Sequence, residues 1–506
     1  MLYPLSYGGL PEHQAYQVYR NDLWTLACEP PMWCFGWQYE RCAPPAAQSA
    51  RIDVMSLRPN WLTPGSDADS PSIWPATANR LGGVLAVGGV TAPQLAADFG
   101  TPLYLLDEAD FRARAVAFQK AFAPWRVYYA GKAFLCKTVA RWAAECGLGV
   151  DVCSLGELTT ALRAGVAPGV IGLHGNNKSE EELATAIEAG VGRIVVDADD
   201  EIDRLAGVLA GLGPQAGPVP VLVRVTPDVQ AHTHAHTQTA VADQKFGFAL
   251  AGGVALAALL RLRQMPGVEL RGVHCHIGSQ ILDVEGYELA VSRLVGLLAD
   301  YRDAAGEQLP ECDLGGGFGI AYTPADEPLG PDVLARRMRA AMAAACASAG
   351  LAEPDCSIEP GRAIVGPAGV ALYTVGVVKP VSLPDGIRTY VAVDGGLSDN
   401  PRPALYQAEY TAVLANRSSS APPILCRVVG KHCETGDILV PHVYLPADVA
   451  PGDIIAVPAS GAYQRAMASN YNGSARPPVV SVHDGAASVL VRRETLDDLL
   501  MLDVGR

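Results

Sequence analysis

The fold is decided by VYYAGKA (127–133), GVDVCS (149–154), VIGLHGNN (170–177) and RIVVDA (193–198), four short β-rich runs that alternate with helical stretches. Four further runs continue the alternation: PVLVRVTP (220–227), LRGVHCHIGS (270–279), CDLGGGFG (312–319) and CSIEPGRAIVG (356–366). One helical stretch, SEEELATAIEAG, carries Ser179 and Glu182 at the spacing of a capping box. Eight buried strands, each followed by a helix over roughly 250 residues, predict a (β/α)₈ barrel of the TIM type. A doubly wound sheet is the alternative, but eight units favour closure.

Beyond about residue 368 the pattern changes to strands separated by turn residues. The strand-like runs are GVALYTVGVVKPV, TYVAVDGG, PILCRVVG, DIIAVPA, PVVSVHDG and ASVLVRR. Few helix signals interrupt them, so this part is predicted to be a β-domain of sandwich or barrel type.

The chain before the barrel divides into two parts. Residues 1–72 show little strand or helix period and are predicted to be an irregular extension, in which Met55 is a possible alternative start. The intact mass of the natively expressed protein tests that start. We expect residues 73–110 to form a lead-in whose first strand pairs with the β-domain. The barrel would then span 111–368 and the C-terminal β-domain 369–506.

Composition excludes several classes of protein. Hydrophobic residues make up 49% of the 506 residues and charged residues 18%, which is typical of a globular chain. The net charge of -15 argues against nucleic acid or an anionic membrane as partner. The apolar runs are too short for a membrane span, and the N-terminus lacks a secretory signal pattern. The twelve Cys contain no C-x-x-C pair, which favours reduced thiols in a cytoplasmic protein over a zinc framework.

Reactive side chains gather where the predicted barrel strands end. In such barrels the functional residues lie at the C-terminal ends of the strands. The residues at or near these ends are Lys132, Asp151, His174, Asn176, His274, His276, Gly278, Ser279, Gly315, Gly316, Gly317, Glu359, Gly361 and Arg362.

This set suits pyridoxal phosphate. A lysine amine can hold the aldehyde, and the GGGFG turn offers backbone N–H groups to the phosphate without Cβ obstruction. An imidazole can stack on the ring, and Glu359 could keep the pyridine nitrogen protonated, which strengthens the ring as an electron sink. Decarboxylation requires such a sink, because the departing CO₂ leaves its electron pair on Cα.

Each of these signals is weak by itself. A lone GGGFG is more often a tight turn, a strand-end lysine is usually solvated, and His-x-His occurs in satisfied cores. The prediction rests on their co-location at one face of the barrel. HTHAHT (232–237) imitates a metal cluster, but it has no fixed helical or strand-pair spacing. We interpret it as a loop and expect no metal.

Ten ordered motifs resemble the diaminopimelate decarboxylase family, which has the alanine-racemase-like fold. They are YYAGKAF, DVCSLGEL, LHGNNKS, AHTHAHTQTAVADQKFG, HCHIGSQI, DLGGGFGIAY, EPGRAIVGPAG, DGGLSDNPRPALY, GKHCETGD and GAYQRAMASNYNG. The resemblance covers about residues 73–506. It implies a barrel plus a β-domain, pyridoxal 5'-phosphate as cofactor, and a homodimer with active sites at the subunit interface.

The resemblance also implies a role for each matching residue. Lys132 resembles the Schiff-base lysine, and Cys433 the proton donor. Glu434 resembles a carboxylate that reads the substrate from the neighbouring subunit. The cofactor would be held by Lys132, Asp151, His174, His276, Ser279, Gly317, Glu359, Pro360, Gly361, Arg362 and Tyr463. The substrate would be held by Arg362, Arg402, Tyr406, Glu434 and Tyr463.

The implied reaction is decarboxylation of meso-2,6-diaminopimelate to L-lysine, the last step of lysine synthesis. An ornithine- or arginine-type decarboxylase is the alternative, but CETGD favours diaminopimelate, since those relatives tend to carry Asp directly after the Cys. The alternative that is not an enzyme is a catalytically inactive relative that binds a partner enzyme. Cys433 could also be an inert thiol, and Arg402 a surface ion-pair partner. Gly131 departs from the family, which usually has a side chain there.

Overall fold

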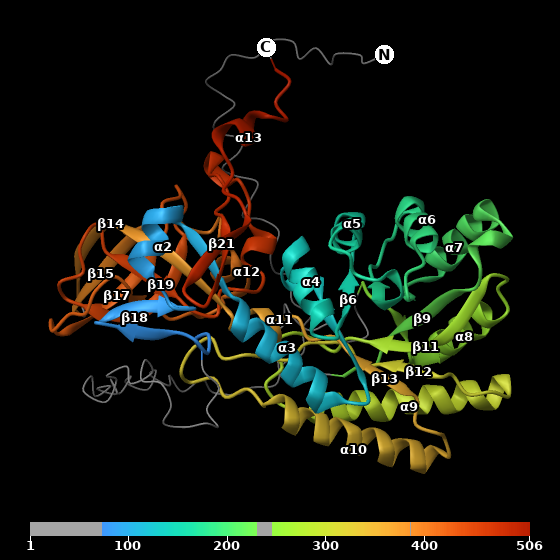
Figure 1. The fold of residues 1–506 in the computed structure, drawn as a ribbon. Helices are drawn as coiled ribbons and strands as arrows, with labels where there is room; N and C mark the ends of the chain where they lie inside the picture. Colours follow the sequence, from blue (N-terminus) through green and yellow to red (C-terminus); the bar gives the residue numbers. More distant parts are fainter. Residues whose placement is uncertain (1–72, 230–244, 385, 506) are drawn as a thin grey trace, which may run out of the picture. The chain divides into compact units, whose positions relative to one another are not determined.

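The computed structural model describes residues 73–229, 245–384 and 386–505. The predicted extension 1–72, with Met55, and the HTHAHT motif lie outside these residues. No helix in the described part is long and apolar enough to cross a membrane. Figure 1 shows two groups of elements, a barrel of strands and helices and a second region made mostly of strands.

Eight parallel strands close into a barrel, as predicted. β9 pairs with both β8 and β11, and β13 pairs with β5, so the order of neighbours returns on itself. A two-residue strand, β10 (Phe248–Ala249), adds to β9 outside the ring. The eight strands are β5 (Arg126–Ala130), β6 (Gly149–Val152), β7 (Ile171–Leu173), β8 (Arg193–Val196), β9 (Val219–Thr226), β11 (Val268–Cys275), β12 (Glu311–Asp313) and β13 (Asp355–Ile358).

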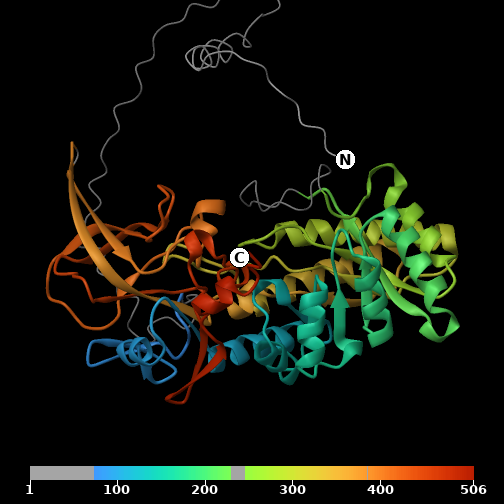
Figure 2. The ribbon, with the colours of Figure 1, turned by 90° about the horizontal axis from the view of Figure 1, so that it is seen from above.

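Helices surround these strands, as the second view shows (Figure 2). Their bounds are α3 (Glu108–Phe122), α4 (Lys137–Glu145), α5 (Leu155–Arg163), α6 (Glu180–Ala189), α7 (Asp199–Leu212), α8 (Val254–Arg263), α9 (Glu285–Ala305), α10 (Pro331–Ala349) and α11 (Arg362–Val365). The predicted capping box is present at α6, where Ser179 and Glu182 cap each other's backbone N–H groups. Gly190 ends the same helix in the left-handed conformation.

The C-terminal strands form a nine-stranded mixed sheet in the described residues. The long β14 pairs with β4 and β19 along its first part and with β15 along its second. The prediction missed β18, which follows the GKHCETGD motif. The strands are β4 (Leu103–Asp107), β14 (Gly369–Leu383), β15 (Gly386–Val393), β16 (Val413–Leu414), β17 (Pro423–Val429), β18 (Ile438–Pro446), β19 (Ile454–Val457), β20 (Val479–His483) and β21 (Ala486–Val491).

The lead-in segment joins this sheet differently from the expectation. Its early strand β2 (Val84–Val87) pairs with β1 (Asn79–Leu81) and β3 (Val90–Thr91) in a separate three-stranded sheet. It is β4, after helix α2 (Ala92–Phe99), that enters the large sheet between β14 and β20. All five residues of β4 are buried, which a central position in the sheet requires.

Candidate active site

A cavity of about 1580 Å³ opens where the barrel strands end. It gathers residues from the loops after β5, β7, β11, β12 and β13 and from the β-domain. The predicted site residues that line it are Lys132, Asp151, His174, Asn176, His274, His276, Ser279, Gly317, Glu359, Gly361, Arg362, Arg402, Tyr406 and Tyr463.

Three residues to which the resemblance assigns a role lie elsewhere in the single chain. The backbone carbonyl of Pro360 accepts a hydrogen bond from the N–H of Ala130, so Pro360 belongs to the wall behind the cavity. Cys433 and Glu434 are exposed and are not among the described residues that line it.

Lys132 and a glycine cradle form one part of the cavity. Lys132 is exposed in a short turn, Gly131–Ala133, directly after β5. Gly317 has a φ of 106°, and a Cβ there would lie 2.5 Å from the carbonyl oxygen of Gly278. A side chain is therefore excluded, and a ligand can approach the backbone of this turn closely. The N–H of Gly316 donates to Nδ1 of His276 at 3.3 Å, which orients that ring.

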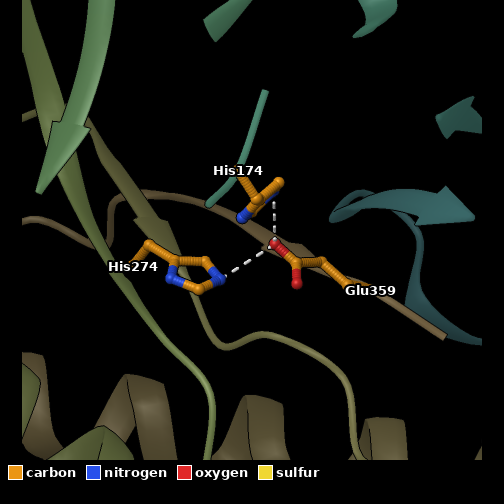
Figure 3. Close-up of side chains that lie close together, drawn as sticks. All are labelled: His174, His274 and Glu359. Atoms are coloured by element: carbon orange, nitrogen blue, oxygen red, sulfur yellow. Dashed lines mark ion pairs between the residues drawn. The ribbon is translucent and has the colours of Figure 1, made fainter. Parts of the chain in front are cut away.

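Another part of the cavity holds a cluster of a buried carboxylate, a buried imidazole and a partly buried one. Glu359 Oε1 lies 3.0 Å from Nε2 of His274 and 3.4 Å from Nε2 of His174. Dashed lines in Figure 3 mark both contacts. Burial lowers the pKa of both histidines to about 3, so both rings are neutral. Burial, followed by the nearby carboxyls of Asp313 and Asp151, raises the pKa of Glu359 to about 8.

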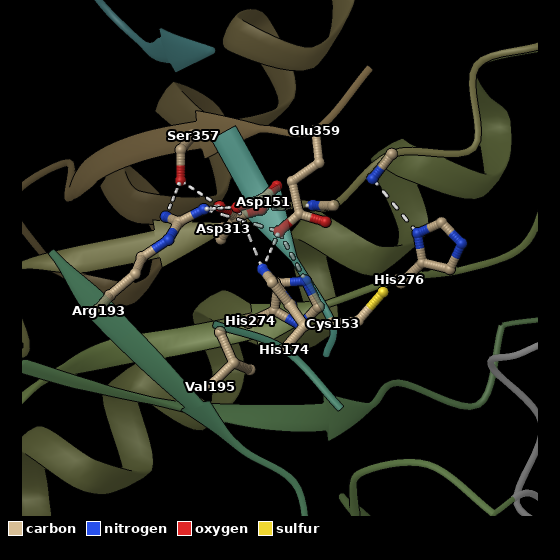
Figure 4. Close-up of polar contacts among 12 residues, drawn as sticks. Asp151, Cys153, His174, Arg193, Val195, His274, His276, Asp313, Ser357 and Glu359 are labelled. Carbon is tan, nitrogen blue, oxygen red and sulfur yellow. Dashed lines mark hydrogen bonds and ion pairs between the residues drawn. The ribbon is translucent and has the colours of Figure 1, made fainter. Parts of the chain in front are cut away.

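A buried guanidinium, that of Arg193, lies beside this cluster. Figure 4 shows its contacts. Arg193 pairs with Asp313 at 2.7 Å and donates to Ser357 Oγ at 2.9 Å. It also lies 3.5 Å from Asp151 and 3.6 Å from Glu359. Burial would raise the pKa of Asp313, but Arg193 holds it at about 2. Because this cation already faces the carboxylates, it disfavours a metal ion here, and we assign none.

Two arginines share one tyrosine at the side of the cavity that faces the β-domain. Arg362 donates to Ser279 Oγ at 2.7 Å and to the hydroxyl of Tyr322. The guanidinium of Arg402 stacks 4.5 Å from the centre of the same Tyr322 ring. Tyr463, whose φ of 59° is unusual for a tyrosine, lies 4.6 Å from the Arg362 guanidinium. The two side chains are thus held in fixed positions that suit carboxylate or phosphate oxygens.

The residues present fit a pyridoxal cofactor. Several buried polar atoms beside the cavity have no aligned hydrogen-bond partner among the described residues, namely Asp151 Oδ1 and Oδ2, His174 Nε2 and Glu359 Oε1. Imidazole and guanidinium nitrogens lie 3.0–3.6 Å from Glu359 Oε1 and Asp151 Oδ1, but none of them makes an aligned hydrogen bond. Buried polar atoms without hydrogen bonds are costly, so this cluster suits a ligand with a polar ring atom. The glycine cradle at Gly317 suits a phosphate, and Lys132 supplies an amine.

Known proteins match the barrel and most of the chain. A model of the pyridoxal-binding domain of pyridoxal-dependent decarboxylases matches residues 108–366, and this is the class of protein that the barrel and its cavity define. Diaminopimelate decarboxylase of Mycobacterium tuberculosis is 49% identical over 446 residues, which cover 86% of this chain and 98% of that one. The Bacillus subtilis protein of the same name is 45% identical and covers 83% and 95%. The chain belongs to the diaminopimelate decarboxylase family.

Solved structures agree with this membership. The crystal structure of diaminopimelate decarboxylase from M. jannaschii in co-complex with L-lysine has a TM-score of 0.79 and 30% identity, covering 85% of this chain and 98% of that one. A lysine/ornithine decarboxylase from Vibrio vulnificus, at 20% identity and a TM-score of 0.65, shares the fold.

The sequence prediction missed Arg193, Asp313, Ser357 and Tyr322. Arg193 and Asp313 stand inside strands, where an alternating or apolar pattern gives no sign of a charge pair across the barrel. A buried charge in a predicted strand is itself a signal that a partner exists elsewhere, and it could have directed attention to both.

Proposed function

We propose that the protein catalyses the pyridoxal-phosphate-dependent decarboxylation of meso-2,6-diaminopimelate to L-lysine and CO₂, the last step of lysine biosynthesis. The observation that carries the proposal is the single cavity that unites Lys132, the Gly317 cradle, Glu359 and two arginines. The names of the relatives and the lysine-bound structure of one of them support it.

The chain's residues divide the work between cofactor and substrate. Lys132 would hold the aldehyde carbon, the turn at Gly317 with Ser279 the phosphate, and Glu359 a proton at the pyridine nitrogen. When bound, the cofactor supplies the electron sink that accepts the pair left on Cα as CO₂ departs. His276 would cover one face of the ring and exclude water from it.

Substrate recognition needs charges of both signs. Arg362 and Arg402 can clamp carboxylate oxygens, and their shared contact with Tyr322 fixes the distance between them. Glu434 would pair with the distal ammonium, and the thiol of Cys433 would return a proton to Cα. Because both residues are exposed in the single chain, we propose that they act in the cavity of a second copy and that the protein is a homodimer with shared sites.

The testing experiment is CO₂ release by the purified, cofactor-loaded protein. It would be offered meso-diaminopimelate, the LL-isomer, ornithine and arginine separately. Release from the meso compound alone, with lysine as product, is expected. Release from ornithine or arginine instead would overturn the substrate assignment. No CO₂ release from any of the four compounds would indicate the alternative of an inactive binding protein.

Shared sites and location have tests of their own. A mixture of Lys132→Ala chains and Glu434→Ala chains should regain activity, because mixed dimers contain one intact site. If activity stays absent, the shared-site proposal is wrong.

We also propose a cytoplasmic location, in keeping with the free cysteines among the described residues; cell fractionation tests it.

A further inference from the structure

The turn that carries Cys433 and Glu434 is exposed at its tip but anchored in buried residues at both ends. Cys433 and Glu434 are exposed, whereas His432 is only 8% exposed and Asp437 only 4%. Two reactive residues thus stand on a fixed base although they project to solvent. The arrangement raises the question of what holds the tip in place.

The carboxylate of Asp437 holds two separate segments together. Its Oδ2 accepts the N–H of His432 at 2.8 Å, and its Oδ1 accepts the N–H of Leu397 at 2.6 Å. The backbone of Asp437 closes the turn as well, because its N–H donates to the carbonyl of Glu434 at 3.2 Å. Its carbonyl in turn accepts the N–H of Gly430 at 3.0 Å. Bonds from a carboxylate to backbone N–H groups are among the stronger hydrogen bonds in proteins.

Glycines leave the carboxylate the space that it occupies. A Cβ at Gly430 would lie 2.2 Å from Asp437 Oδ2, and a Cβ at Gly396 would lie 2.7 Å from both oxygens. Neither position can carry a side chain while Asp437 keeps its place. The three residues therefore form one packed unit, and the carboxylate has a single position within it.

His432 provides a second anchor for the same turn. Its Nε2 lies 2.8 Å from Ser398 Oγ, and its Nδ1 lies 3.2 Å from Asn472 Oδ1. The ring also packs 5.4 Å from that of Tyr471. The turn is thus tied to residues 395–400 and to residues 471–472.

Residues 395–400 lead directly into α12 (Arg402–Tyr406), which carries the cavity residue Arg402. The N–H of Lys431 donates to the carbonyl of Gly395 at 3.0 Å, which adds a backbone link between the two segments. One carboxylate therefore lies between the turn that bears Cys433 and the segment that bears Arg402.

We propose that Asp437 is a positioning residue for the reaction, with His432 as the second anchor. It fixes the turn from which Cys433 and Glu434 reach the cavity of the second copy, and it ties that turn to the segment that leads to Arg402 in this chain's own cavity. The assignment rests on the proposed function for its kinetic consequence. That Asp437 anchors the turn follows from the contacts alone.

The first test compares Asp437→Ala and Asp437→Asn with a matched control. Asp453→Asn removes a carboxylate that is also buried in the β-domain and also accepts a backbone N–H, at 2.9 Å from Ala450, but it does not touch the turn. Because a displacement of about 1 Å can cost about 100-fold in rate, we expect kcat/KM to fall about 100-fold in Asp437→Ala. A smaller fall, of about 10-fold, is expected in Asp437→Asn, whose amide keeps one acceptor.

Cofactor affinity separates positioning from general damage. The affinity for pyridoxal phosphate, measured by absorbance titration, should stay within about two-fold of the wild type in both Asp437 variants, as in Asp453→Asn. Wild-type kcat/KM in Asp437→Ala would overturn the proposal. Loss of cofactor affinity in proportion to kcat/KM would overturn it too, because the role would then be structural.

The second test is independent of catalysis. Hydrogen exchange of the full-length protein, followed by mass spectrometry, should show faster exchange at residues 395–400 and 430–437 in Asp437→Ala but not in Asp453→Asn. Unchanged exchange there would refute the holding of the turn. If the wild type releases no CO₂ from any substrate while exchange still rises, the proposed function fails and the anchoring role of Asp437 stands without its kinetic consequence.

Discussion

Replacing Arg193 by Met is expected to destabilise the apo protein strongly. The change leaves Asp313, which lies 2.7 Å from the guanidinium, as a buried carboxylate without its cation. It also removes the hydrogen bond to Ser357 and the stacking of the guanidinium 3.7 Å from the Tyr128 ring. Breaking one side of a buried ion pair typically costs about 3–5 kcal/mol, and we expect the free energy of unfolding to fall by that amount.

The double variant Arg193→Met/Asp313→Asn isolates the unpaired charge. It removes both charges. The new amide oxygen can still accept the N–H of Gly315, which lies 2.7 Å from Asp313 Oδ1 in the unsubstituted protein. We expect it to recover at least about 1 kcal/mol of the loss, because position 313 no longer carries a buried charge without its cation. Arg263→Met is the surface control, since Arg263 is exposed and pairs only at the surface with Glu307 at 2.6 Å.

The assay is urea unfolding without added cofactor at constant ionic strength. The change in the free energy of unfolding is the shift of the urea midpoint multiplied by the m-value. The reasoning would be refuted in either of two ways. Arg193→Met could cost less than about 1 kcal/mol, or the double variant could be no more stable than the single one.

Three further changes test other parts of the site. Gly317→Ala should weaken pyridoxal phosphate binding at least about ten-fold in an absorbance titration, because the new Cβ would lie 2.5 Å from the Gly278 carbonyl oxygen; unaltered affinity would contradict the cradle. Tyr322→Phe should raise KM for the substrate more than it lowers kcat, since one arginine loses its hydroxyl partner; equal falls in kcat and kcat/KM would argue otherwise. The protonated form of Glu359 contributes stability below its ordinary pKa near 4.5, and this contribution is lost as the pH rises towards about 8. Between these two pH values the free energy of unfolding of the wild-type apo protein should fall by up to about 1.4 kcal/mol per pH unit, and this fall should be absent from Glu359→Gln. Urea midpoints of both proteins at several pH values measure it; parallel pH profiles of the two proteins would contradict the prediction.

The sequence was sufficient for the barrel because its signals are local. Each predicted run contains buried apolar residues of one strand, and each following helix has its own caps, as Ser179 and Gly190 show at α6. Closure followed from the number of units, and in a closed barrel the residues after each strand must converge on one face. Lys132, His174, Ser279 and Glu359 could therefore be placed together before any contact was known.

Other features of the fold have no local signal. The pairing of β4, rather than β2, with the large sheet could not be predicted, because the partner strands β14 and β20 lie more than 250 residues further along the chain. β18 was missed because its nine residues carry two prolines and a histidine, which weaken the strand pattern.

The sequence by itself thus determined the barrel, the β-domain and the residues at the strand ends, since periodicity, caps and motif order are properties of neighbouring residues. Only the tertiary structure decided which charges face each other. Arg193 on β8 meets Asp313 on β12 across the barrel interior, and Tyr322 receives two arginines from different parts of the chain. It also showed Cys433 and Glu434 outside the cavity of their own chain, on a turn fixed by Asp437. Such pairings depend on distance in space, which packing sets and which no spacing along the chain records.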